Sequence, residues 1–169
     1  SSLANIIPVS NGATEPYIWN LSDCDTLLPA NSIYYPTIST ALGALQANLS
    51  TLEPPFIFWL VPGFIGDIPS FNTSLKQVEL INYPVTKDSS DVAVIGGVNI
   101  FGSGSNFTLK LEAIRIVSFV SGACVMLKSS DALELIVSNS SVSCPTLVTG
   151  GTGSRVNLTG SRFESSLKV

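Results

Sequence analysis

The segment 101–118, FGSGSNFTLKLEAIRIVS, is followed by two segments with the same pattern, VMLKSSDALELIVSNSSV (125–142) and VTGGTGSRVNLTGSRFES (148–165). At offsets of 24 and then 23 residues, three columns are apolar in every copy: Leu109, Leu133 and Val156; Leu111, Leu135 and Leu158; Phe101, Val125 and Val148. The column between the first two holds Lys110, Glu134 and Asn157, as in a strand whose successive side chains point to opposite faces. A strand, a turn of small residues and a second strand, repeated every ~23 residues, bury their apolar row only by stacking on their neighbours. The repeats therefore predict an all-β fold, a right-handed parallel β-helix (solenoid).

The region before the repeats predicts one helix. Ile38, Leu42, Leu45 and Leu49 recur at helical spacing, which predicts a helix over about 39–49 that ends before Pro54. Residues 1–36 lack a sustained period and are interpreted as an extended N-terminal arm, so the β-helix domain covers 37–169, with the helix as its N-terminal cap.

The stretch PPFIFWLVPGFIGDIP (54–69) is the most apolar run of the chain. Its apolar part has about half of the ~20 residues that a membrane helix needs, and Pro62-Gly63 would interrupt such a helix, so no membrane span is expected. A strand that is apolar on both sides must be covered on both sides. We expect Phe56, Phe58 and Leu60 to face the core of an early coil.

The order of an amphipathic helix, FIFWLVPGFIGDIP (56–69), QVELIN (77–82) and VAVIGGVNIFG (92–102) resembles the start of pectin-lyase-like right-handed parallel β-helices, as in viral and phage tailspikes. In those proteins a helix caps the first coil, and a strand ending in Pro-Gly-aromatic leads into it. The resemblance covers about 130 residues from Ile38 onward and rests on pattern. It implies a fold shared by polysaccharide lyases, glycoside hydrolases, esterases and tailspikes.

Composition narrows the function classes. Charged residues make up 12% of the chain, against a usual ~25%, and the net charge is −4 without a basic face, so we expect no nucleic-acid binding. The chain has no His, which excludes the usual nucleophilic triad. Cys24, Cys124 and Cys144 lack metal-ligand spacing, although a Cys124–Cys144 bridge stays open. No cofactor is predicted.

Carboxylates are the residues that could carry catalysis on glycans. Glycoside hydrolases need two of them about 5 to 9.5 Å apart. No column of the alignment holds two, and the nearest pair is Glu112 and Glu134, which lie diagonally at an expected ~7 to 8 Å. A solvated wall explains this pair equally well. Asp88 and Asp91 suggest a metal ligand set but fit an ordinary turn better, so no metal site is predicted.

Two further sets of polar residues are candidates for glycan contacts. Arg115, Asn139 and Arg162 share a column, which would make a stripe able to bind a carboxylate or a sugar hydroxyl, or a charged column that discourages edge pairing. N-x-S/T sequons occur at Asn20, Asn48, Asn72, Asn106, Asn139 and Asn157. Glycosylation and the ordinary use of Asn, Ser and Thr in turns both account for them.

These observations favour a non-catalytic structural or adhesive module of a viral or other surface assembly, such as a spike, fibre or minor capsid component. Nothing after Ser165 predicts a cap for the last coil, which favours contact with other subunits or with copies of the same chain, a homotrimer among them. Surface glycans are the other expected partners, and a virion or extracellular surface is the expected location. The alternative is a pectin-lyase-like carbohydrate-active enzyme.

Overall fold

In the residues that it describes, the computed structural model consists mainly of strands with one α-helix, which confirms the prediction of an all-β fold. It describes residues 6–9, 17–18, 33–47, 52–60, 65–82, 93–95, 98–101, 106–117, 125–128, 131–143, 146–149, 151, 153–163 and 167–168. Asp88, Asp91, Asn20, Asn48 and the three cysteines lie outside these residues. The predictions made for them therefore stay predictions.

The strands form three parallel sheets and one short antiparallel pair. The six-stranded sheet contains, in spatial order, β1 (Ile6–Val9), β4 (Phe56–Leu60), β7 (Gln77–Asn82), β10 (Phe107–Glu112), β13 (Leu133–Ser138) and β16 (Arg155–Thr159). The second sheet contains β5 (Ile65–Asp67), β8 (Ala93–Ile95), β11 (Arg115–Val117), β14 (Ser141–Val142) and β17 (Arg162–Phe163). The third contains β6 (Phe71–Asn72), β9 (Val98–Phe101), β12 (Val125–Lys128), β15 (Thr146–Thr149) and β18 (Leu167–Lys168). The antiparallel pair is β2 (Tyr17–Ile18) with β3 (Ile33–Tyr34), and a 3₁₀ turn (Thr73–Leu75) follows β6.

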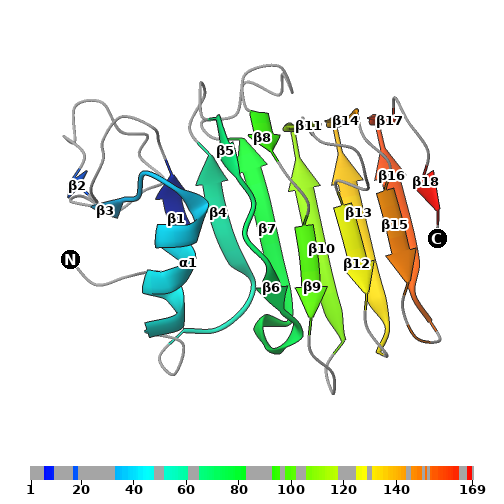
Figure 1. Ribbon diagram of the computed structural model, residues 1–169, viewed down its shortest axis with the longest axis horizontal. Coiled ribbons are helices and arrows are strands. Elements are labelled where there is room, and N and C mark those ends of the chain that lie inside the picture. Colours follow the sequence, from blue (N-terminus) through cyan, green and yellow to red (C-terminus); the bar gives the residue numbers. More distant parts are fainter. Residues whose placement is uncertain are drawn as a thin grey trace.

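From β4 onward the chain visits the three sheets in a fixed order. β4 lies in the first sheet, β5 in the second and β6 in the third. Every later set of three strands repeats that order beside the previous set. We call one such set a layer. Figure 1 shows the layers following one another along the long axis in sequence order, with helix α1 (Ile38–Ala47) at one end and β18 near the other.

The pairing register differs from the predicted alignment. Leu109 pairs with Leu135, and Leu135 with Val156. The layers are thus offset by 26 residues and then by 21, as the contacts of Ser140 with Ile114 and with Ser161 also show, where 24 and 23 were predicted. The two errors cancel, so Leu109 and Val156 do share a column. The third predicted column is wrong, because Val125 pairs with Val98 and Thr146 instead of Phe101 and Val148.

Unequal connections explain the register error. Residues 118–124 join β11 to β12, whereas residues 143–145 are enough to join the equivalent strands β14 and β15. When whole repeats are aligned without gaps, the difference is spread over both offsets, so the predicted values of 24 and 23 lie between the observed 26 and 21. Both errors are two residues long, which preserves the side-chain alternation, so every residue of β10 and β13 that was predicted to face inward does so.

The interior is a stack of apolar side chains from successive layers. Residues alternate between buried and half-buried along both β10 and β13, and Leu109, Leu111, Leu133, Leu135 and Val137 are at most 1% exposed. Phe56, Phe58 and Leu60 of β4 are also buried, as predicted. In the last layer Leu158 is 43% exposed, whereas its partner Val137 is fully buried.

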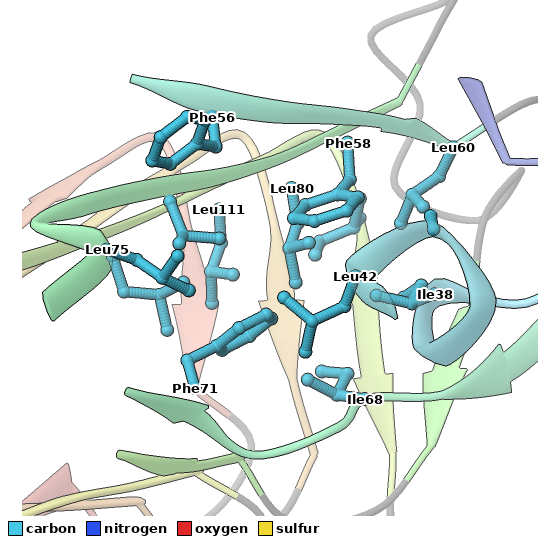
Figure 2. Close-up of a cluster of buried hydrophobic side chains, with 14 of the residues drawn as sticks. Ile38, Leu42, Phe56, Phe58, Leu60, Ile68, Phe71, Leu75, Leu80 and Leu111 are labelled. Carbon is cyan, nitrogen blue, oxygen red and sulfur yellow. The ribbon is translucent and has the colours of Figure 1, made fainter. Parts of the chain in front are cut away.

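Helix α1 covers the core beside β4, as the prediction of a helix over about 39–49 required. Its side chains Ile38, Leu42 and Leu45 belong to the same buried cluster as Phe58 and Leu60. Figure 2 shows Ile38 and Leu42 pointing into the space enclosed by Phe58, Leu60, Ile68 and Phe71. The predicted boundary of an arm at residue 36 stays a prediction, although Ile6–Val9 do extend the six-stranded sheet as β1.

Thr37 begins the helix. Its hydroxyl oxygen accepts a hydrogen bond from the Thr40 amide at 3.1 Å, and the Thr37 amide donates to the Thr40 hydroxyl at 3.3 Å. These reciprocal bonds satisfy amides that have no partner within the first helical turn. No helix in the described residues has the length and apolar character needed to cross a membrane.

Serine hydroxyls bind the backbone at the corner between the first and second sheets. The Ser140 hydroxyl accepts a hydrogen bond from the Ile114 amide of the previous layer at 3.2 Å and donates one to the Ser138 carbonyl at 2.9 Å. Ser161 repeats this arrangement one layer later, accepting from the Ser140 amide and donating to the Thr159 carbonyl. The high serine content therefore has a structural use, because each of these hydroxyls satisfies a corner amide that strand pairing leaves free.

Replacement of Ser140 by alanine should lower the free energy of unfolding by about 1 to 3 kcal/mol, because it leaves the Ile114 amide without its partner in a buried corner. Ser143→Ala is the matched control, since the Ser143 side chain is exposed and donates only to the Ile116 carbonyl. Urea denaturation of both variants measures the difference. Equal losses for the two would contradict this role of Ser140.

Candidate ligand-binding face

The outward side chains of the six-stranded sheet form the most charged described surface, which we call the polar face. Because alternate residues of each strand point away from the core, register places them in rows across the layers. One row is Gln77, Thr108, Glu134 and Arg155; the next is Glu79, Lys110, Ile136 and Asn157; the third is Ile81, Glu112, Ser138 and Thr159.

Lys110 forms ion pairs with two of the carboxylates on the polar face. Its Nζ lies 3.9 Å from Oε1 of Glu79, one layer away, and 4.0 Å from Oε2 of Glu112 on its own strand. Gln77 Nε2 donates a 3.1 Å hydrogen bond to the other oxygen of Glu79. Glu79 is only 8% exposed, so these contacts stabilise a carboxylate that has lost most of its hydration.

Glu134 forms the second ion pair of this face. Nε of Arg155, in the next layer, donates a hydrogen bond to Oε2 of Glu134. The Arg155 side chain is 75% exposed and the Glu134 side chain 23% exposed, so solvent reaches this pair. Such an exposed ion pair contributes only about 0.2 to 1 kcal/mol to stability.

The predicted catalytic pair is not close together. Glu112 pairs with Ser138, whereas Glu134 pairs with Thr108, so the two glutamates lie four strand positions and one layer apart. At about 3.3 Å per residue this separates their Cα atoms by more than about 13 Å, instead of the expected ~7 to 8 Å. The expected distance was wrong because the assumed register was two residues short, and a catalytic role for either glutamate stays a prediction.

Glu79 was missed in the sequence. It and Glu112 both lie within 4.0 Å of one ammonium nitrogen, so these oxygens are at most about 8 Å apart, below the upper end of the range that glycosidases use. The alternation of QVELIN (77–82) places Glu79 outward, and this signal was available. Without a register for β7, however, nothing aligned Glu79 with Lys110.

The predicted stripe of Arg115, Asn139 and Arg162 is also corrected. Arg115 pairs with Ser141, and Ser141 with Arg162, so the middle member of the column is Ser141. Asn139 instead occupies the corner before β14, with a positive φ of 49°. Its backbone N–H donates a hydrogen bond to the Thr159 carbonyl. Arg115 is exposed, so the proposed contact with a carboxylate or sugar hydroxyl stays a prediction for that residue.

The described sequons differ in exposure. Asn106, Asn139 and Asn157 are exposed, whereas Asn72 is half-buried. Oδ1 of Asn72 accepts a 2.9 Å hydrogen bond from the Ser74 amide. The first three asparagines are therefore accessible to a glycosylating enzyme. Their glycosylation stays a prediction.

A small depression of about 170 Å³ lies at the edge of the polar face, where β10, β13 and β16 begin. Its polar lining comes from Asn106, Thr108, Glu134 and Arg155. Ala132 and Gly153 supply its small residues, and the first residues of β10 and β13 complete it. Within the described residues, no three His, Cys, Asp or Glu side chains gather in a way that could hold a metal ion.

Comparison with known proteins finds no family model, no curated protein and no solved structure that matches this chain.

Proposed function

We propose that this chain is a right-handed parallel β-helix module with a structural or adhesive role in a viral or other surface assembly. The observation that carries the proposal is the repeated visit of the chain to three parallel sheets in one fixed order, with a helix beside the first layer. Stacked layers of this kind give a stiff body with long flat walls. The resemblance to pectin-lyase-like tailspikes supports the same interpretation.

Charge pairing on the polar face favours a non-catalytic role. Glu79 and Glu112 share Lys110, and Glu134 pairs with Arg155. The side chains of the two glutamates within reach of each other are both largely covered, with Glu79 10% and Glu112 20% exposed. A general acid or base must come within hydrogen-bond reach of the substrate, and Glu79 offers little surface for this.

Partners and location follow from the same proposal. A chain in which only 12% of the residues are charged suits contact with other subunits, including copies of this chain in a trimer, and with neutral surface glycans. The surface of a virion or a cell is where such a module would act.

Mass measurement in solution tests the proposal. We expect light scattering coupled to size separation to show a stable oligomer, and we expect no release of reducing ends or unsaturated products from uronic-acid polymers. A stable monomer that cleaves such a polymer, and that loses this activity in Glu112→Gln, would overturn the proposal in favour of the enzyme.

A further inference from the structure

The depression at the start of β10, β13 and β16 crosses three layers. Asn106 precedes β10, Ala132 precedes β13, and Gly153 lies two residues before β16. A Cβ on Gly153 would lie 3.9 Å from Cβ of Ala132, so the two small residues are neighbours in adjacent layers. The hollow exists because both positions lack a large side chain. Glycine also suits position 153 because its φ is +92°.

The polar groups around the hollow are balanced in charge. Glu134 supplies hydrogen-bond acceptors and Arg155 supplies donors, and their charges cancel. Within the described residues, the Asn106 amide and the Thr108 hydroxyl have no side-chain partner. Two backbone groups beside the hollow already have a partner, because Ser154 Oγ accepts from the Leu133 amide and donates to the Gly151 carbonyl.

We propose that this depression binds a neutral ligand with adjacent hydroxyl groups, of which a neutral sugar is the common example. One hydroxyl would donate to the Glu134 carboxylate, its neighbour would accept from the Arg155 guanidinium, and Asn106 and Thr108 would bind further hydroxyls. Because the charges of Glu134 and Arg155 cancel, an anionic or cationic ligand would lose hydration here without a net opposite charge to compensate it. The volume of about 170 Å³ is below the 300 Å³ at which drug-sized pockets begin, which limits the contact to about one sugar ring.

This inference rests on the adhesive part of the proposed function and names its ligand class. Asn106 is itself in a sequon, so the protein for the test should come from a bacterial host in which that asparagine carries no glycan. The probes are glucose, galactose, mannose and N-acetylglucosamine, compared with glucuronic acid and glucose 6-phosphate. NMR amide shifts of the whole chain report where each probe binds.

We expect at least one neutral sugar to shift amides within 106–108, 132–134 and 153–155 and to bind more tightly than either charged probe. Arg155→Gln should weaken this binding about ten-fold, because a hydrogen bond from a charged donor is lost. Ala132→Leu should abolish it by filling the hollow. Lys110→Gln is the matched control, since it removes an ion pair of the same face that does not line the depression, and it should bind as the unchanged protein does.

Three results would overturn this inference: no neutral sugar shifts these amides, a charged probe binds more tightly, or Ala132→Leu binds normally. Amide spectra of the variants confirm that each is folded. The oligomer expected under the proposed function does not depend on these outcomes. If the protein is an oligomer but binds no neutral sugar, the inference about the ligand is refuted and the assembly proposal stands.

Discussion

Replacement of Leu135 by aspartate is expected to prevent folding. Leu135 is 1% exposed and lies in the inward column of β13 between Leu109 and Val156. Its neighbours in that column offer neither a cation nor a hydrogen-bond donor, so the carboxylate would lose its hydration without compensation. The effective cost is several kcal/mol, and the cavity left by the leucine adds to it. Together these terms approach the ~5 to 15 kcal/mol that stabilise a typical domain.

Ile136→Asp is the matched control for this substitution. Ile136 is the next residue along β13, but it points outward and is half-buried on the polar face, where Lys110 is its partner in the previous layer. We expect it to fold with a cooperative thermal transition, whereas Leu135→Asp should give insoluble or unfolded protein by circular dichroism. Native-like melting of Leu135→Asp would show that the inward column is wrong.

Replacement of Phe58 by alanine is expected to lower the free energy of unfolding by about 3 to 5 kcal/mol. Phe58 is fully buried, and its ring centroid lies 6.3 Å from that of Phe71. Figure 2 shows it beside Leu80, in the region that Leu42 of helix α1 covers. Its removal leaves a cavity between the helix and the first layers that backbone pairing keeps from collapsing.

Denaturant unfolding of Phe58→Ala beside Ile57→Ala measures this effect. Ile57 is adjacent in β4 but points to the other side and is half-buried, so its truncation should cost markedly less. Losses of equal size would contradict the assignment of Phe58 to the core beneath the helix.

The sequence predicted what local pattern controls. Alternation in FTLKLE and LELIVS identified the inward residues of β10 and β13, because a period of two is independent of the partner strand. The spacing of Ile38, Leu42 and Leu45 likewise predicted the helix. The pairing register could not be predicted from this pattern. Register depends on the number of residues in each connection, and the connection 118–124 is longer than the equivalent connection 143–145.

The predicted neighbours within the candidate sites were wrong for the same reason. Glu112 and Glu134 were brought together by an offset of 24, and the observed offset of 26 moves them apart. The same shift replaces Asn139 by Ser141 between Arg115 and Arg162. The pairs of Glu134 with Arg155 and of Glu79 with Lys110 could be predicted only after the registers of β13 with β16 and of β7 with β10 were known. The sequence predicted which residues face outward, but it did not predict which of them are neighbours in adjacent layers.

The most direct test of the central claim, parallel layers stacked in one register, is the pattern of backbone amide to α-proton contacts between strands by NMR. We expect β10 to show contacts with β13 at an offset of 26 residues and β13 to show contacts with β16 at an offset of 21, all in the parallel pattern. Antiparallel contacts, or parallel contacts between Leu109 and Leu133 at an offset of 24, would contradict the account.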